Sequence, residues 1–181
     1  MFTRTARLLL RPGWAEDARA LASAIGDERI VRNLSSPPWP YTQADAEAFL
    51  ARPRDPVLPS LLIFKRTAAN PVLVGSCGLS RLPSGGVQLG YWIALPFWGQ
   101  GYATEAGRAV VDIARALRLP RLQASFFVDN PASGRVLAKL SFEPTGITAP
   151  FPSSGRGCEA PGRILTLKLD DSESAVESLA A

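Results

Sequence analysis

The sequence predicts a single α/β domain built around a mixed β-sheet. Its 181 residues, 46% of them hydrophobic, are enough for one substantial core and leave little room for a second. Three consecutive apolar, β-forming runs in the middle of the chain predict an antiparallel meander. A helix and another strand follow the last of these runs, and the resulting βαβ unit forces a parallel strand pair with a right-handed connection. We therefore expect an α/β (α+β) fold whose sheet is mixed and mostly antiparallel.

The first part of the chain is expected to be mainly helical. The run RLLLRP is short, apolar and closed by proline, which suits a strand. Apolar residues then recur at helical spacing, and Thr42 followed by Asp45 gives the capping-box pattern that begins another helix. The expected elements are a strand at 7–12, helices at 14–25 and 27–34, and a third helix from Thr42 to Pro53.

The rest of the chain alternates strands and helices. Asn130 is a preferred N-cap, and Pro131 fits the first position of the helix that follows it. The expected strands lie at 60–66, 71–79, 87–94, 121–128 and 163–169, with one helix from about 102 to Arg118 and another opening at Asn130. The stretch 144–162 is rich in Pro, Ser and Gly and is expected to be a loop. Residues 1–169 form the expected domain, and 170–181 a flexible acidic tail.

Composition excludes several kinds of chemistry. The chain has no histidine, so histidine triads, imidazole metal sites and imidazole bases are impossible. Cys77 and Cys158 lie far apart and form no CxxC pair, so we expect free thiols and no metal site. The apolar run at 8–10 is too short for a signal peptide or a membrane span, and the protein is expected to be soluble, cytoplasmic and without a membrane partner.

Charge favours a small anionic ligand. The net charge is +4, and 17 of the 20 basic residues are arginine, whose planar fork matches phosphate. Arg4, Arg7 and Arg11 crowd together, but the other basic residues are scattered and no aromatic and basic interleaving occurs. We therefore expect no nucleic-acid partner.

The segment WGQGYATEA, residues 98–106, is the strongest candidate for binding that anion. Glycine permits positive φ and close approach, and the following helix offers unpaired N–H groups at its N-terminus. A Walker A loop needs Lys and Ser/Thr after its last glycine, whereas Tyr102 and Ala103 follow Gly101; GQGYAT also breaks the dinucleotide pattern GxGxxG. A phosphate cradle of another kind is therefore expected, and an ATP-binding or NAD-binding regulator has no motif in its favour.

Three segments taken together carry a family resemblance: TARLLLRP, LGYWIALPFWGQGYATEA and DNPASGRVLAKLSF. Through them the sequence resembles, over about residues 5–169, the GCN5-related N-acetyltransferases (GNAT), in particular the RimJ/RimL-type branch that acetylates N-termini of ribosomal proteins. The family pattern Q/R-x-x-G-x-G/A reads here Trp98 to Ala103, and its first position departs from the pattern. The resemblance implies a seven-stranded sheet, flanked by helices and splayed between the fourth and fifth strands, 87–94 and 121–128.

The same resemblance implies acetyl-CoA as cosubstrate, with its pantetheine in the splay and its pyrophosphate on the backbone N–H groups of the glycine loop. The implied cofactor contacts are Ile93, Ala94, Trp98, Gly99, Gln100, Gly101, Tyr102, Ala103, Thr104, Asn130 and Ser133. Gly99 and Gly101 also suit a plain strand-to-helix turn. Asn130 is an N-cap whatever else it does.

For catalysis the resemblance implies a backbone N–H near Trp92 or Ile93 as oxyanion donor, with Trp92 our first choice. Many relatives place a tyrosine acid where this chain has Leu137, and Ser133 is expected instead to hydrogen-bond the CoA sulfur, although it also suits a purely local helix role. Relatives often carry a glutamate base where this chain has Gln88. The base is left open among Asp27, Glu28, Tyr91 and bulk water.

The expected function is transfer of an acetyl group to a primary amine by direct attack on the thioester. At pH 7 deprotonation costs about 4.6 kcal/mol for a lysine amine and about 1.4 kcal/mol for an α-amino group, so an N-terminus needs no strong base. The acceptor is left open between a peptide N-terminus and a small amine, with its pocket shaped by 35–40 and 144–162. A catalytically silent acyl-CoA-binding module is the alternative, and both monomer and homodimer remain open.

Overall fold

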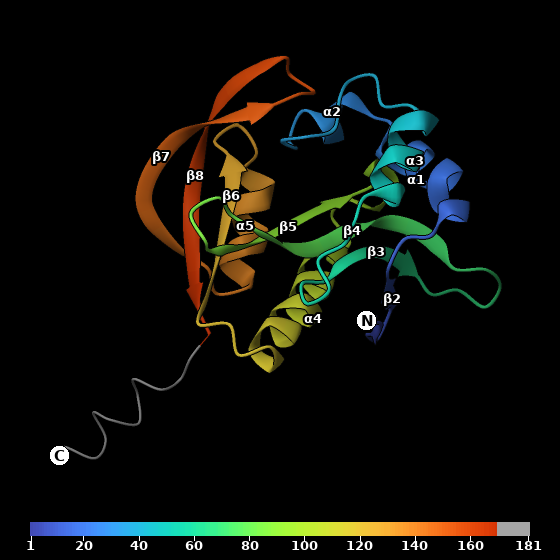
Figure 1. The fold of residues 1–181 in the computed structure, drawn as a ribbon, viewed down its shortest axis with the longest axis horizontal. Helices are drawn as coiled ribbons and strands as arrows, with labels where there is room; N and C mark the ends of the chain where they lie inside the picture. The colour runs from blue at the N-terminus through green and yellow to red at the C-terminus, as the bar shows by residue number, and fades with distance from the viewer. Residues whose placement is uncertain (170–181) are drawn as a thin grey trace.

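The computed structural model describes residues 1–169, which form one open sheet of eight strands with helices on both faces (Figure 1). The strand order is β1-β2-β3-β4-β5-β6-β8-β7. The strands are β1 (Thr3–Arg4), β2 (Leu8–Arg11), β3 (Ser60–Lys65), β4 (Val72–Arg81), β5 (Val87–Ile93), β6 (Arg121–Phe127), β7 (Glu143–Ser153) and β8 (Cys158–Lys168). The α-helices are α1 (Ala18–Ile25), α2 (Glu28–Val31), α3 (Gln43–Ala51), α4 (Tyr102–Ala116) and α5 (Pro131–Lys139).

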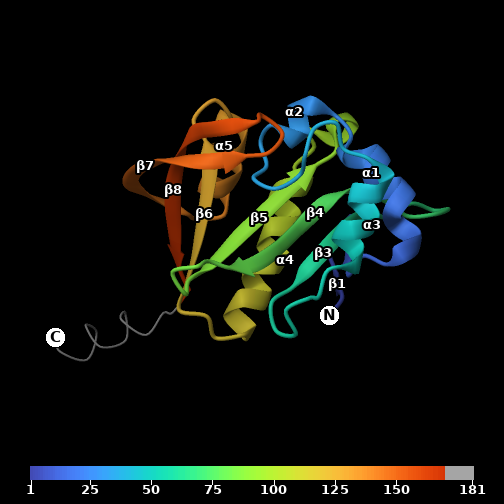
Figure 2. The ribbon, with the colours of Figure 1, turned by 45° about the horizontal axis from the view of Figure 1, so that its top comes forward.

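The helices form two layers with the sheet between them. Helices α1 and α3 cover β3 and β4 on one face, and α4 and α5 lie on the opposite face (Figure 2). On the first face Leu21 and Ala46 pack with Leu62 and Phe64 of β3. On the second face a larger cluster joins the apolar stripes of α4 and α5 to β2, β4, β5, β6 and β8. Cys77 lies in this cluster and is 1% exposed.

The sheet opens between β5 and β6. Strand β5 pairs antiparallel with β4 from Val87 to Ile93, and β6 pairs antiparallel with β8 along its full length. Between β5 and β6, the described residues contain one register pair, Gln88 opposite Gln123, and this pairing is parallel. Both the βαβ unit and the splay between these two strands are therefore confirmed. Beyond Gln88 the facing edges of the two strands diverge.

The strand count and the C-terminal region differ from the expectation. The sheet has eight strands, whereas the resemblance implied seven and the sequence located six. The two strands that the sequence did not locate are the short Thr3–Arg4 at one edge and the long Glu143–Ser153 at the other. The expected loop at 144–162 is instead most of the β7–β8 hairpin. Strand β7 is the last in the sheet, and proline is tolerated at such an edge because one row of its backbone groups has no strand partner.

Helix boundaries follow the local signals closely. The Thr42 hydroxyl oxygen accepts a hydrogen bond from the Asp45 N–H, and the Asp45 carboxylate accepts one from the Thr42 N–H, which confirms the capping box. The Asn130 side chain caps α5, and Pro131 occupies its first turn as expected. The helix expected at 14–25 begins instead as a 3-10 turn, Ala15–Asp17, before α1. The expected tail at 170–181 lies outside the described residues.

Candidate functional site

The glycine loop lies between the end of β5 and the start of α4. Gly99 and Gly101 have φ of +73° and +80°, values that side-chain-bearing residues adopt at a cost. Gly101 is the N-cap of α4 and has no side chain to cap it. The first amides of this 15-residue helix, on Tyr102, Ala103 and Thr104, therefore lack a capping side chain and carry the positive end of the helix dipole. The loop can thus offer several N–H groups to one anion.

Arg7 braces this loop from the turn before β2. Its Nη1 donates to the Gln100 carbonyl at 3.0 Å, and its guanidinium lies 4.6 Å from the centre of the Tyr102 ring. Its Nε donates to Glu105 at 2.7 Å, and its backbone N–H donates to the same carboxylate at 2.9 Å. Arg7 thus fixes both the loop and the first turn of α4. The sequence marked Arg7 only as part of a basic cluster, and no local signal connects it to a loop 93 residues away.

Glu105 stays ionised in this contact. Burial alone would raise its pKa, but hydrogen bonds from Thr5 and from the backbone and side chain of Arg7 outweigh burial and hold the pKa below its usual range. Its charge offsets that of Arg7, and the carboxylate also stabilises the N-terminal end of α4. The charge left for an incoming anion therefore comes mainly from the helix end, and the Arg7 contribution is shared with Glu105.

The open edge of β5 presents Ile93 rather than Trp92. The Ala94 N–H donates to the Val74 carbonyl of β4 at 2.8 Å. Because alternate residues turn their backbone groups to opposite edges of a strand, Trp92 also faces β4, whereas Ile93 faces the splay. The Ile93 carbonyl indeed accepts a hydrogen bond from the Trp98 indole at 2.6 Å, on that open side. Of the two donors named from the sequence, the Ile93 N–H is therefore the one directed toward the splay, and the role of either residue as oxyanion donor stays a prediction.

Ser133 lies across the splay, in the first turn of α5. Its backbone N–H donates to Asn130 Oδ1 at 3.3 Å, so the local role expected for Asn130 is present. Its Oγ lies 2.8 Å from the hydroxyl of Tyr91 on β5, and the Ser133 carbonyl oxygen lies 3.1 Å from the same hydroxyl, so the single phenol proton has two acceptors within reach. Burial raises the pKa of Tyr91 well above its ordinary value, so the phenol stays neutral and is a donor rather than a base.

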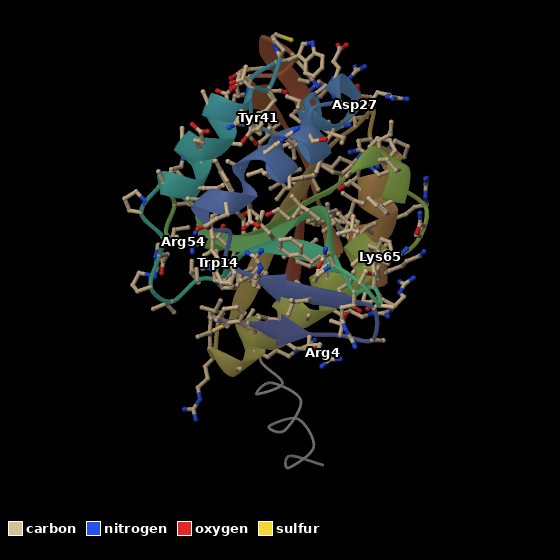
Figure 3. The ribbon with its side chains drawn as sticks, turned by 90° about the vertical axis from the view of Figure 1, so that its right-hand side faces the viewer. Arg4, Trp14, Asp27, Tyr41, Arg54 and Lys65 are labelled. Atoms are coloured by element: carbon tan, nitrogen blue, oxygen red, sulfur yellow. The ribbon has the colours of Figure 1, made fainter. Side chains whose placement is uncertain are left out.

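The remaining base candidates have other partners. Asp27 caps α2 and pairs with Arg29 at 2.7 Å; hydrogen bonds from Arg29 lower its pKa, so it is a weak base. Asp27 and Tyr41 lie at the end of the molecule opposite Arg4 (Figure 3). Glu28 lies in the first turn of α2. Gln88 donates its amide to Ser80 at 3.1 Å. The hydrogen bonds of Ser133 in the described residues are to Tyr91 and Asn130 rather than to any of these candidates.

The other implied cofactor contacts lie on the same stretch of chain. Ala94 follows β5 and is buried, whereas Trp98 is exposed apart from its indole bond. Gln100 donates its amide to the Pro96 carbonyl at 3.1 Å and so helps to shape the loop. Thr104 is 8% exposed, on the inner side of the first turn of α4. Direct contact of any of these residues with a ligand stays a prediction.

Two segments expected to shape an acceptor pocket meet in the structure. The tip of the β7–β8 hairpin docks on the chain after α2, where Ser153 Oγ donates to the Leu34 carbonyl at 3.0 Å and the Ser154 N–H donates to the Ser35 carbonyl at 3.0 Å. Arg156 holds Asp129, which precedes the Asn130 cap, through two bonds of 2.8 and 2.9 Å. These contacts join the 31–35 segment, the hairpin tip and the start of α5.

Comparison with known proteins identifies the family. Residues 7–143 match the family profile described as "Acetyltransferase (GNAT) domain", which covers most of the chain. The chain therefore belongs to the GNAT acetyltransferase family, and within it resembles the RimJ/RimL-like branch. It is an acyltransferase that depends on acetyl-CoA.

Relatives and solved structures agree with this assignment. The chain is 26% identical over 169 residues, covering 89% of both chains, to "Uncharacterized N-acetyltransferase p20" of Bacillus licheniformis. A GNAT-family acetyltransferase structure from Bacillus anthracis superposes with a TM-score of 0.76 at 19% identity, covering 93% of this chain and 99% of that one. RimL, a ribosomal L7/L12 alpha-N-protein acetyltransferase solved in complex with coenzyme A, superposes at 0.73 with 18% identity, covering 94% and 99%. At these identities the two superpositions establish the fold alone.

The described residues contain neither a metal-binding cluster nor a membrane-spanning helix. No group of three or more His, Cys, Asp or Glu side chains within 1–169 is arranged to hold a metal ion. No helix in that part of the chain has both the length and the apolar character to cross a membrane. Cys77 and Cys158 are both free thiols, the first buried and the second exposed, and burial raises the pKa of Cys77 to about 12.

Proposed function

We propose that the protein transfers the acetyl group of acetyl-CoA to a primary amine, either a peptide N-terminus or a small-molecule amine, by direct attack of the amine on the thioester. One observation carries the proposal: the glycine loop, the open edge of β5 and Ser133 all lie around the same splay. Such an arrangement offers N–H groups for a pyrophosphate, unpaired strand groups for pantetheine amides and a hydroxyl near the reacting end.

Binding of the cofactor pyrophosphate depends on backbone N–H groups of the glycine loop. The pyrophosphate binds the backbone N–H groups of Gly99 to Thr104. Nothing lies within 4 Å of a Cβ built at Gly99, so the space beside the loop backbone is open. Asn130, next to Ser133, lies on the far side of the splay. Cofactor recognition therefore depends on loop conformation more than on the side chain of Trp98, which departs from the family pattern.

The chemical step uses two donors. The Ile93 N–H stabilises the oxyanion that forms as the amine attacks, and the Ser133 hydroxyl donates a hydrogen bond to the sulfur of the departing thiolate. A thiol with a pKa of about 8.5 is a good leaving group, so this modest assistance is sufficient. Positioning and electrostatic stabilisation then supply most of the rate.

The acceptor is an amine that is readily deprotonated. Gln88 is bonded to Ser80 and has no carboxylate, and Asp27 is paired with Arg29, so neither of these candidates is a ready proton acceptor. An α-amino group, whose reference pKa is near 8, meets this condition far better than a lysine amine near 10.4. The name of the RimL relative, which acts on a protein N-terminus, supports the same acceptor class. We further propose a cytoplasmic location and a monomeric or homodimeric state.

A catalytically silent acyl-CoA-binding module is the second candidate. Two observations favour it: Leu137 stands where many relatives have a tyrosine acid, and Gln88 stands where they often have a glutamate base. In this case the splay would bind acetyl-CoA as described above, without turnover.

Titration calorimetry with acetyl-CoA, with ATP and NAD as controls, tests the binding half of the proposal. Thiol release from acetyl-CoA in the presence of pooled short peptides and, separately, small amines tests the transfer half. Binding with amine-dependent thiol release supports the enzyme and identifies its acceptor class. Binding without release from any amine favours the silent module. Failure to bind acetyl-CoA refutes both.

A further inference from the structure

The contact between Tyr91 and Ser133 joins the two sides of the splay. Tyr91 belongs to β5 and Ser133 to α5, 42 residues later, and the two hydroxyl oxygens are 2.8 Å apart. The Tyr91 hydroxyl is also within 3.1 Å of the Ser133 backbone carbonyl. Both side chains are partly buried. Tyr91 is also packed against the large apolar cluster formed by α4, α5 and the sheet, which fixes its ring.

We propose that Tyr91 is a positioning residue for acetyl transfer: its hydroxyl orients the Ser133 hydroxyl so that the serine proton points at the sulfur of acetyl-CoA. The inference rests on the function proposed above. It assigns Tyr91 a role that differs from that of a base, and it explains how a serine can serve where Leu137 has replaced a tyrosine.

The geometry of the two hydroxyl groups is compatible with this role. A serine in the first turn of a helix rotates freely and otherwise bonds local backbone groups. The Tyr91 hydroxyl has a single proton and two acceptors within reach, Ser133 Oγ at 2.8 Å and Ser133 O at 3.1 Å. When it donates to Oγ, it occupies an acceptor position of the serine and leaves the serine proton free to point elsewhere. A neutral phenol is required for this donation, and Tyr91 is held neutral by its burial.

The bond changes need no proton from either residue. The amine nitrogen bonds to the thioester carbon, the carbon–sulfur bond breaks, and its electron pair remains on sulfur. The nitrogen loses one proton and the thiolate gains one, through solvent. Ser133 and Tyr91 keep their own protons and stabilise the negative charge on sulfur through two hydrogen bonds in series.

Four proteins test the inference: Tyr91→Phe, Ser133→Ala, the double variant, and Tyr41→Phe as a matched control. Tyr41→Phe also removes one phenol oxygen from a partly buried tyrosine, on the opposite face of the sheet. We expect Tyr91→Phe to lower kcat about tenfold, with the acceptor KM and the acetyl-CoA Kd changed less than about twofold. Ser133→Ala should lower kcat at least as much. The double variant should be no slower than Ser133→Ala, because Tyr91 acts through the serine.

A second readout does not depend on turnover. Titration of the thiol of bound CoA, followed by thiolate absorbance, should give a higher pKa in Tyr91→Phe than in the wild type, and no difference between Ser133→Ala and the double variant. Tyr41→Phe should match the wild type in both assays. Melting temperatures of the four variants identify any loss of folding.

Two results would overturn the inference while leaving the proposed function intact: multiplicative losses of kcat in the double variant, or an unchanged thiol pKa in Tyr91→Phe. A purely structural Tyr91 would lower the melting temperature and weaken acetyl-CoA binding without shifting the thiol pKa. If the wild type itself binds no acetyl-CoA, the proposed function fails and the inference fails with it. If it binds without turnover, the thiol titration alone decides the question.

Discussion

Gly101→Ala tests the central feature of the site, a loop whose backbone binds the cofactor. Gly101 has φ of +80° and caps α4, so the direction of the first helical amides depends on this conformation. Alanine in the left-handed region costs roughly 1–2 kcal/mol relative to glycine. The added Cβ would meet only the Arg7 guanidinium, at 3.5 Å, which is an ordinary contact. The substitution therefore acts through backbone conformation rather than through a clash.

The expected loss of affinity follows from the hydrogen bonds involved. If the loop relaxes to a negative φ at residue 101, at least one N–H no longer points at the pyrophosphate. A hydrogen bond to a charged group contributes about 1.5–3 kcal/mol, and each 1.4 kcal/mol is a factor of ten in Kd. Gly101→Ala should therefore weaken acetyl-CoA binding by about 10- to 150-fold.

Gly85→Ala is the matched control. Gly85 has φ of +87° in the turn between β4 and β5, and nothing lies within 4 Å of its Cβ position. Both variants carry the same backbone penalty, and their melting temperatures should fall by similar amounts. Calorimetric titration with acetyl-CoA should show a weakened Kd for Gly101→Ala alone. Equal affinities for Gly101→Ala, Gly85→Ala and the wild type would refute the reasoning that the loop backbone binds the pyrophosphate.

Three further predictions concern the surroundings of the site and the fold. Arg7→Gln should weaken acetyl-CoA binding several-fold in calorimetry, because the loop loses its brace to Gln100. The exposed Arg115→Gln should leave the Kd unchanged, and equal effects of the two variants would rule out a specific role for Arg7. Ser141→Gly should raise the melting temperature by about 2–4 °C, since Ser141 has φ of +65° and glycine relieves roughly 1 kcal/mol of strain; a lower melting temperature would contradict this. Asp17 is paired with Arg11 at 2.7 and 2.8 Å; burial raises its pKa, but these bonds and the Trp14 N–H outweigh burial and lower it. The stability that the Asp17 carboxylate contributes is present above its unfolded pKa of about 3.9 and is lost as the pH falls through its lower folded pKa. Asp17→Asn should therefore have a lower melting temperature than the wild type at pH 7, and its melting temperature should fall less than that of the wild type when the pH is lowered through this range.

Local sequence signals were sufficient where a structure depends on neighbouring residues. The capping pair Thr42 and Asp45, the Asn130 cap and the need for glycine at 99 and 101 are all visible in a few consecutive letters. Hydrophobic period predicted the meander and the βαβ unit, and from these the parallel contact between β5 and β6 follows.

The predictions from sequence were wrong or incomplete where strand pairing outweighs the local residue composition. Residues 144–162 contain the prolines and small polar residues typical of loops, yet most of them belong to the β7–β8 hairpin, because β8 provides a partner strand and β7 has to satisfy only one edge. The extra strand β1 is likewise two residues long and exists through pairing with β2. The choice between Trp92 and Ile93 as donor also could not be made from the sequence, since it depends on which edge of β5 pairs with β4.

By itself the sequence determined the backbone of the site: the glycine loop, the start of α4, and the capped start of α5 with Ser133 in its first turn. These features depend on allowed φ values and on hydrogen bonds between residues a few positions apart, so the local sequence is sufficient to predict them. Only the tertiary structure decided which side chains converge there. Arg7 reaches Glu105 98 residues away, and Tyr91 reaches Ser133 42 residues away. Such contacts depend on strand register and helix packing, and no local pattern encodes them.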